Sequence, residues 1–253
     1  MHEALRIPGN SDVTPEVTPP RDGSEPPRRA IRGVPARHAL DWYADAMRLW
    51  KRGPLTFCAM ALIIVVANFA LNLVPIVGVA VGQLLLPLIE CGLLYASLAA
   101  DRGDRPRLGH LVAVFAAPPR ALAAVIGASL VIFGAEALVA NALGGFDLLR
   151  PGSNAESISA TALVATYAAG IAVSLPLTFV PFVALFDGAG MRAAFAQSGA
   201  AFARNALPLA LYGALSFVLL MAGLITSGVG LLLALPWSAA ASYAAWKDVH
   251  AVA

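Results

Sequence analysis

The sequence is poor in charge, because only 13% of its 253 residues are Asp, Glu, Lys or Arg, whereas 59% are hydrophobic. Soluble domains carry about 25% charged residues, so this deficit indicates a membrane protein. The formal net charge of +2 is the sum of charges that cluster in a few segments. No basic stretch is interleaved with aromatic residues, which argues against a nucleic acid partner.

Side chains suited to metal binding or catalysis are also scarce. Cys58 and Cys91 lie inside apolar runs, and the four histidines form no ligand-spaced pair, so we predict no disulfide, metal site or cofactor. The HExxH, GxSxG, P-loop and GxGxxG motifs are absent. The serines inside apolar segments have no His or Lys at membrane depth to activate them. We therefore expect that the chain is not an enzyme.

Large apolar side chains are few in residues 1–37, which are rich in Pro, Arg, Asp, Glu, Ser and Gly. Such a segment cannot bury enough surface to offset the entropy lost on ordering, so we expect a disordered basic tail. It has no apolar core of the kind that a signal peptide contains. The favoured role is a solvated tail that fixes topology, and the alternative is a tail that binds a partner or anionic lipid.

Long apolar runs, by contrast, are abundant. Residues 76–100 form a run of 25 with Glu90 as its only charged side chain, and a basic loop follows at 101–107. At about 1.5 Å per residue, a helix of this length crosses a hydrocarbon core of roughly 30 Å. Comparable runs predict an all-α membrane protein with six transmembrane helices, over about 54–74, 76–100, 119–143, 159–185, 206–226 and 229–246. Pro176 and Pro181 should kink the fourth span.

Amphipathic segments precede alternate spans. Residues 38–52 place Leu40, Tyr43, Met47 and Trp50 on one face and charged residues on the other, which predicts a helix lying in the membrane interface. Two further amphipathic helices are predicted near 108–115 and 190–205. Each would introduce one pair of spans.

These pieces suggest an internal repeat within a domain of residues 38–250, with units at about 38–101, 107–187 and 190–248. Each unit runs from an amphipathic helix through a proline that begins a span to a return span that ends at an aspartate. The matching residues are Pro54, Pro119 and Pro208 at the starts, Pro87, Pro176 and Pro236 within the return spans, and Asp101, Asp187 and Asp248 at the ends. The expected architecture is three hairpins, each preceded by an amphipathic interfacial helix. The alternative is that any three helical hairpins share such features.

The cationic residues predict an orientation. Sixteen of the 17 Lys and Arg residues fall on one side of this six-span topology, and Arg150 is the exception. The positive-inside rule places that side, with both termini, in the cytoplasm. The expected location is therefore the cell inner membrane.

Polar side chains inside the spans are the candidate functional residues. A charged side chain at a helix centre costs roughly 2.5–3.5 kcal/mol on insertion scales, which draws attention to Glu90 and Glu136. Gln83 shares a helix face with Glu90, and Asn68 and Asn72 lie one turn apart. This candidate intramembrane polar site could line a cavity open to the outside, or a proton-linked site. The favoured alternative is that its residues form interhelical hydrogen bonds.

The C-terminal sequence carries a resemblance. The pattern G-x-G-L-L-x-x-L-P…Y-A-x-x-x-D comprises Gly228, Gly230, Leu231, Leu232, Leu235, Pro236, Tyr243, Ala244 and Asp248. With the amphipathic start, it resembles an uncharacterised group of bacterial six-helix inner-membrane proteins over residues 40–250. Similar units of a short helix followed by a span occur in the membrane domain of some glycerophosphodiester phosphodiesterases. The resemblance implies the fold and supplies no activity.

Two functional hypotheses follow. The first is a membrane accessory or scaffold component that organises a membrane protein partner, a homo-oligomer or local lipid of the bilayer through its amphipathic helices and basic tail. The alternative is a small-molecule or lipid permease, or a transporter subunit, that uses Glu90 and the polar residues around it. A cavity reaching Glu90 would favour transport, whereas a closed bundle with Glu90 bonded to a neighbouring helix would favour the scaffold.

Overall fold

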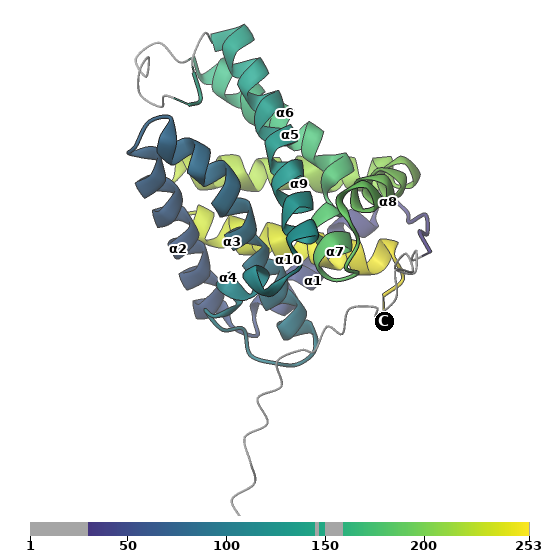
Figure 1. Cartoon of the computed structure of the whole chain (residues 1–253). Coiled ribbons are helices and arrows are strands. Elements are labelled where there is room, and N and C mark those ends of the chain that lie inside the picture. Colours follow the sequence, from purple (N-terminus) through teal and green to yellow (C-terminus); the bar gives the residue numbers. More distant parts are fainter. Residues whose placement is uncertain (1–29, 145–146, 150–158, 253) are drawn as a thin grey trace, which may run out of the picture.

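The computed structural model describes residues 30–144, 147–149 and 159–252, and the regular elements within these ranges are all helical (Figure 1). The predicted all-α class is therefore confirmed. In chain order the elements are α1 (His38–Trp50), α2 (Pro54–Asn72), α3 (Val77–Asp101), α4 (His110–Ala113), η1 (Val114–Ala116), α5 (Pro119–Gly144), α6 (Ala160–Ser174), η3 (Leu175–Leu177), α7 (Val180–Leu185), α8 (Met191–Arg204), α9 (Ala206–Ile225) and α10 (Leu231–Val249).

Five helical segments of the described chain are long and apolar enough to cross a membrane, as in a multi-pass membrane protein. They are Pro54–Asn72, Val77–Asp101, Pro119–Leu143, Ala160–Leu177 and Ala206–Ile225. The predicted sixth span, now α10, is not among them. Its C-terminal part carries Lys247 and Asp248, and the helices α1, α2, α3 and α9 pack against it. A helix covered by protein in this way needs fewer apolar side chains than one that faces lipid.

The fourth predicted span is interrupted at the expected prolines. The α-helix ends at Ser174, a 3₁₀ turn containing Pro176 follows, and a new helix starts with Pro181 in its first turn. Proline lacks the amide proton that continues the helical ladder and its ring clashes with the preceding turn. The segment that was predicted over 159–185 is therefore two helices joined by a break.

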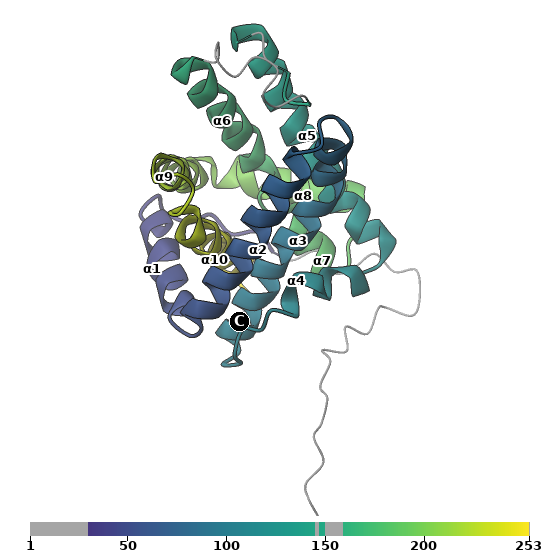
Figure 2. The same ribbon diagram turned by 90° about the vertical axis from the view of Figure 1, so that its left-hand side faces the viewer.

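The hairpins α2–α3, α5–α6 and α9–α10 form a closed ring. The first helix of each packs against the return helix of another, because α5 contacts α3, α9 contacts α6, and α2 contacts α10. The hairpins are not parallel. In Figure 2, α9 and α10 are seen nearly end-on whereas α2, α3, α5 and α6 run across the view, so the third hairpin crosses the others steeply. The pair α5 and α6 projects beyond the rest of the molecule (Figures 1 and 2).

The short helices that precede the hairpins pack against return arms. The helix α4 and turn η1 contact α3, α8 contacts α7 and η3, and α1 contacts α10. On α1 the buried face contains Trp42 and Leu49, while Leu40 is 63% exposed. The buried face of α1 therefore differs from the predicted apolar face, which included Leu40. The helix is rotated so that Trp42 and Leu49 are buried where α1 packs against α10. The location of these helices in the membrane interface stays a prediction.

Residues 30–37 differ from the sequence expectation for the tail. They lie against the helical domain, with the Arg32 amide donating to the Val249 carbonyl at 2.9 Å and the Val34 amide donating to Asn205 Oδ1 at 2.8 Å. Ile31 and Val34 also pack against the main apolar core. The packed domain thus begins before His38. Residues 1–29 of the predicted tail lie outside the described residues.

Two glycines allow backbones to approach closely. A Cβ at Gly78 would lie 2.0 Å from the Leu71 carbonyl oxygen, so this glycine permits the tight α2–α3 hairpin. A Cβ at Gly92 would lie 2.5 Å from the Cα atom of Leu111. The helix α4 can therefore sit directly on α3 only because residue 92 has no side chain.

Candidate functional site: an intramembrane cavity

A cavity of about 490 Å³ lies among the three hairpins. Its wall takes residues from α3, α5, α6, α7, α9 and α10, at positions near the middle of each hairpin. The polar side chains of the wall are Gln83, Glu90, Ser129, Glu136, Ser174, Thr178, Tyr212, Ser216, Ser238 and Ser242. The remainder is mainly aliphatic and aromatic. A concave, largely apolar site with a few converging polar groups is the usual form of a small-molecule site.

Glu90 faces this cavity from α3. Protein atoms surround Glu90. Its side chain is nevertheless accessible to a solvent-sized molecule, because it lines the cavity. Pro87, one turn earlier, lies within the same helix and also lines the cavity. No hydrogen bond or ion pair joins the Glu90 carboxyl to any residue that the structure describes. The hydrogen bond to a neighbouring helix that a purely structural role would require is therefore not formed within the described chain.

Glu136 enters the same cavity from α5. Its carboxyl lies over Gly170 of α6, where a Cβ atom would be only 2.0 Å from Oε1. The absence of a side chain at residue 170 thus provides the space that the Glu136 carboxyl occupies. Within the described residues this carboxyl also has no hydrogen bond or ion pair. Two acidic side chains from different hairpins therefore share one cavity.

The remaining predicted site residues divide into two groups. Gln83 lines the cavity, and its backbone carbonyl accepts a long hydrogen bond of 3.5 Å from Ser129. Asn68 and Asn72 are outside the cavity wall, because the Asn72 side chain turns back along α2 and donates to Asn68 Oδ1 at 2.9 Å. The prediction that the two asparagines share one face is confirmed. Their expected place with Glu90 in one polar site is wrong.

The hydroxyl groups of the cavity wall were missed by sequence reasoning. Ser216, Ser238 and Ser242 come from α9 and α10, and Thr178 lies within the proline break, between η3 and α7. Thr178 and Ser238 each follow the internal proline of their return arm by two residues, and this shared position is the signal that could have indicated them. Several of these hydroxyls donate to carbonyls of the preceding turn, as Ser242 does to Ala239 at 2.8 Å.

An aromatic layer lies between the cavity and the C-terminal end of α10. Phe182 of the cavity wall stacks on Trp246 with ring centroids 5.3 Å apart, and Phe186 packs edge-on against the same indole at 5.5 Å. On the other side, Tyr43 of α1 stacks on Tyr212 at 5.9 Å. The Tyr43 hydroxyl reaches Ser216 Oγ at 2.6 Å, so α1 directly contacts a residue of the cavity wall.

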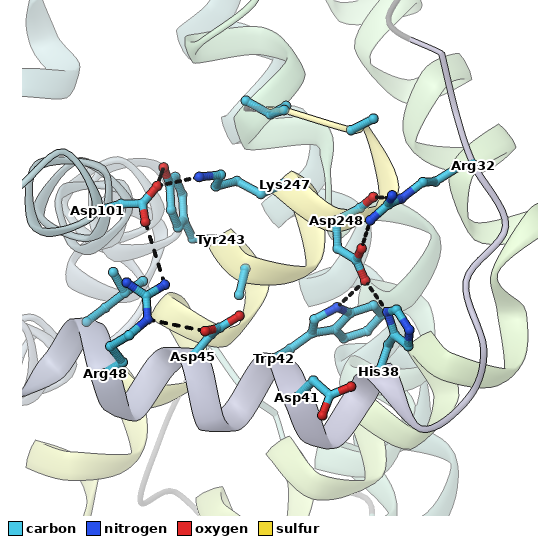
Figure 3. A pocket seen from close by; sticks show the side chains of 14 residues that line it. Arg32, His38, Asp41, Trp42, Asp45, Arg48, Asp101, Tyr243, Lys247 and Asp248 are labelled. Atoms are coloured by element: carbon cyan, nitrogen blue, oxygen red, sulfur yellow. Dashed lines mark hydrogen bonds and ion pairs between the residues drawn. The ribbon is translucent and has the colours of Figure 1, made fainter.

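The opposite side of this layer carries a second, ionic pocket of about 530 Å³ (Figure 3). One of its two centres is Asp248, which joins the start of the described chain to its end. Its carboxylate pairs with Arg32, meets His38 Nδ1 at 2.6 Å, and accepts a hydrogen bond from Trp42 Nε1 at 3.0 Å (Figure 3). Burial alone would raise the pKa of Asp248, but these hydrogen bonds outweigh it and hold the pKa below its ordinary value.

The second centre is Asp101, which joins the first hairpin to the third. Lys247 Nζ donates to its carboxylate at 2.6 Å and the Tyr243 hydroxyl donates at 3.1 Å, while Arg48 of α1 lies 3.8 Å away (Figure 3). The closing aspartates 101 and 248 are therefore centres of ionic contacts between distant segments as well as ends of helices. We refer below to this region, which comprises residues 30–37, α1, Asp101 and the Tyr243–Asp248 end of α10, as the charged end.

Neither site offers the donor set of a metal centre. Within residues 30–144, 147–149 and 159–252, no group of three His, Cys, Asp or Glu side chains could hold a metal ion. Comparison with known proteins found no matching family, no similar curated protein and no similar solved structure. The resemblance carried by the C-terminal pattern therefore stays a prediction.

Proposed function

We propose that this chain is a small-molecule permease or transporter subunit that binds its solute in the cavity among the three hairpins. The observation that supports this proposal is the pair of carboxyl groups, Glu90 and Glu136, that face one cavity without a partner among the described residues. Isolated carboxyl groups at membrane depth are costly. A structural role would normally offset this cost with hydrogen bonds, whereas a binding role leaves the groups available for a ligand.

The arrangement of the helices is consistent with this proposal. Every hairpin contributes to the cavity wall, so movement of any hairpin relative to the others would change the cavity. We propose that α10 is a sixth, largely protein-covered span and that the hairpins derive from a threefold repeat. Under this topology the charged end faces the cytoplasm, as the distribution of Lys and Arg predicts, and the aromatic layer closes the cavity on that side.

The proposal is of a non-catalytic protein. No His or Lys lies among the described residues of the wall, and within the described chain no hydrogen bond joins a cavity hydroxyl to the Glu90 or Glu136 carboxyl. No hydroxyl is therefore in contact with a base that would convert it to a nucleophile. Cys91 lines the cavity but its side chain is mainly packed into the core, with 4% exposure. Neither feature suggests a reaction.

The alternative, an accessory or scaffold component, has weaker support. It relied on α1 as a free amphipathic helix, but Trp42, Ala46 and Leu49 of that helix are buried in the packed domain. Its outward-facing Asp41 and Asp45 and its exposed Leu40 still leave a surface to which a partner could bind. This alternative becomes the preferred function if the cavity proves to be closed to water and solutes.

Thiol labelling tests whether the cavity is open to water. In a Cys58→Ala/Cys91→Ala background, Ser216→Cys places a thiol in the cavity wall and Val218→Cys places one on the same helix at a position that is 63% exposed and outside the cavity. The protein is reconstituted in lipid nanodiscs and treated with a cationic methanethiosulfonate. Only a hydrated thiol ionises and reacts with this reagent.

We expect labelling of Ser216→Cys, detected by intact mass, and no labelling of Val218→Cys over the same time. Equal inertness of the two thiols would mean that water does not reach the cavity, and the permease proposal would be abandoned. Labelling of both positions after the protein is unfolded in detergent and urea provides the positive control for reagent activity.

A further inference from the structure

The described groups of the cavity wall that can carry charge near neutral pH are acidic. The wall's ionisable groups include the carboxyls of Glu90 and Glu136, and no Lys, Arg or His is present among its described residues. The cationic side chains of the described chain that form ion pairs are instead at the charged end, beyond the aromatic layer. Inside a low-dielectric site, interactions between charges are several times stronger than in water. The cavity should therefore attract cations and repel anions.

Apolar groups make up most of the remaining wall. Ile132, Phe133, Ile171, Leu220 and Leu235 come from four different helices. A bare metal ion would gain nothing from these groups and would need several oxygen ligands converging on one point. The two carboxyls come from α3 and α5, and no third carboxylate, His or Cys completes such a set in the described chain. A ligand with an apolar body and a positive charge matches both the apolar part and the acidic part of the wall.

From these two features we propose that the ligand of the cavity is an organic cation, a protonated or quaternary amine or an equivalent onium ion on an apolar body. This inference rests on the proposed function and names its class of solute. The cationic group binds beside Glu90 and Glu136, and the apolar body contacts the aliphatic and aromatic wall. Phe133, Phe182 and Tyr212 add aromatic side chains to the wall, and aromatic rings also attract a cation. The serine and threonine hydroxyls can hydrogen-bond a protonated amine.

The cavity has a suitable size for such a ligand. Its volume of about 490 Å³ lies within the roughly 300–1,000 Å³ that is typical of small-molecule sites. It also exceeds the needs of a single small ion. A bound cation would neutralise one ionised carboxyl and a proton the other, which explains how the chain can maintain two acidic groups at membrane depth.

Two probes of nearly equal shape and opposite charge test the inference. Tetraphenylphosphonium and tetraphenylborate are titrated into the full-length protein in nanodiscs, and bound probe is measured after subtraction of partitioning into empty nanodiscs. The smaller cation tetraethylammonium is tested beside them, so that size alone does not decide the result. The variants are Glu90→Gln and Glu136→Gln, and Asp45→Asn is a control that removes a negative charge at the charged end, outside the cavity.

We expect saturable binding of at least one cation and affinity for tetraphenylborate weaker by at least about tenfold. Glu90→Gln and Glu136→Gln should each weaken cation binding by at least about tenfold, because each removes a charge next to the ligand. Asp45→Asn should leave it within about twofold, as expected for an exposed charge at a distance. The same ordering is expected when uptake of the cation into proteoliposomes is measured.

Failure of this inference is distinguishable from failure of the permease proposal. If Ser216→Cys is labelled but the anion binds as tightly as the cations, or no probe binds, the organic-cation assignment is overturned and the solute cavity stands. If no probe binds and Ser216→Cys is as inert as Val218→Cys, both are overturned. Cation binding that is unaffected by both Glu substitutions places the probe elsewhere and also overturns the assignment.

Discussion

The charged end and the cavity treat their carboxyl groups in opposite ways. Asp101 and Asp248 are each only 16% exposed and are surrounded by cationic groups and hydrogen-bond donors. Glu90 and Glu136 have free carboxyls on the wall of a cavity, without such partners in the described chain. Protein groups thus balance the negative charge of Asp101 and Asp248, which hold distant segments together. In the cavity, only a solute or a proton could balance the charge of Glu90 and Glu136. This difference separates residues for stability from residues for function.

The largest expected effect is on Asp248. Asp248→Ala removes the carboxylate that Trp42 Nε1, His38 and Arg32 share, and so weakens the attachment of residues 30–37 to α10. We expect the free energy of unfolding to fall by about 2–4 kcal/mol, because three donors lose an acceptor whose side chain is only 16% exposed. Thermal unfolding in detergent, followed by tryptophan fluorescence, measures the change. Asp45→Ala is the matched control, because its carboxylate is 52% exposed and its pair with Arg48 contributes about 0–1 kcal/mol. Equal shifts for the two variants would contradict the assignment.

A pair of glycine substitutions compares a tight helix contact outside the cavity with the wall of the cavity. A Cβ at residue 92 would lie 2.5 Å from backbone atoms of α4, whereas a Cβ at residue 170 would mainly meet the movable end of the Glu136 side chain. We expect Gly92→Ala to cost about 1–3 kcal/mol, because the backbone must shift, and Gly170→Ala to cost less than about 1 kcal/mol. The same unfolding measurement tests both variants.

Ligand binding should show the reverse order. Gly170→Ala displaces the Glu136 carboxyl from its place against α6 and should change cation affinity, while Gly92→Ala should not do so in the folded fraction. A larger loss of stability in Gly170→Ala than in Gly92→Ala would show that the Glu136 carboxyl is held rigidly. The expectation that the cavity carboxyl can move would then be contradicted.

Acid provides a milder way to break the charged end. The folded-state pKa of Asp248 lies below the ordinary value of 3.8, so folding favours its ionised form. The stabilisation from this group is therefore fully present above about pH 4 and is lost as the pH falls through the lower folded-state pKa. We expect unfolding temperatures of the wild type and Asp248→Asn to converge as the pH is lowered from 6 to 3. A difference that stays constant over this interval would mean that Asp248 contributes no pH-dependent stabilisation.

Much of the fold could be predicted from the sequence because apolar runs and prolines act locally. Long apolar runs account for five of the six predicted spans in the described chain, and Pro176 and Pro181 interrupt the fourth, whereas Pro87 and Pro236 each lie inside a continuous helix. The shared face of Gln83 and Glu90 follows from the helical period alone. Each of these features depends on residues close together in the chain, and each agrees with the structure.

The features that could not be predicted from the sequence depend on packing between distant segments. The helix α2 is apolar on all sides, so its sequence does not indicate whether Asn68 and Asn72 face the other hairpins or the outside. Tyr243 precedes Asp248 by five residues in the repeat, yet it donates to Asp101 of a different hairpin. The serines of the cavity resemble serines that merely bond to the preceding helical turn. These serines lie in one cavity wall only because the three hairpins pack against one another in a closed ring.

The smallest expected effect on stability is that of Glu90→Gln, and this variant tests the difference between the cavity and the charged end most directly. Glu90→Gln retains the shape of the side chain and removes an ionisable group that has no described partner, so no internal hydrogen bond or ion pair is lost. Without ligand we expect the free energy of unfolding to change by less than about 1 kcal/mol, or to rise slightly, because a neutral amide is less costly at membrane depth than a carboxylate. With a saturating cation, the wild type should gain thermal stability through binding and Glu90→Gln should gain much less. A ligand-free destabilisation as large as that of Asp248→Ala would instead assign Glu90 to the structural class, and the functional difference between the two regions would disappear.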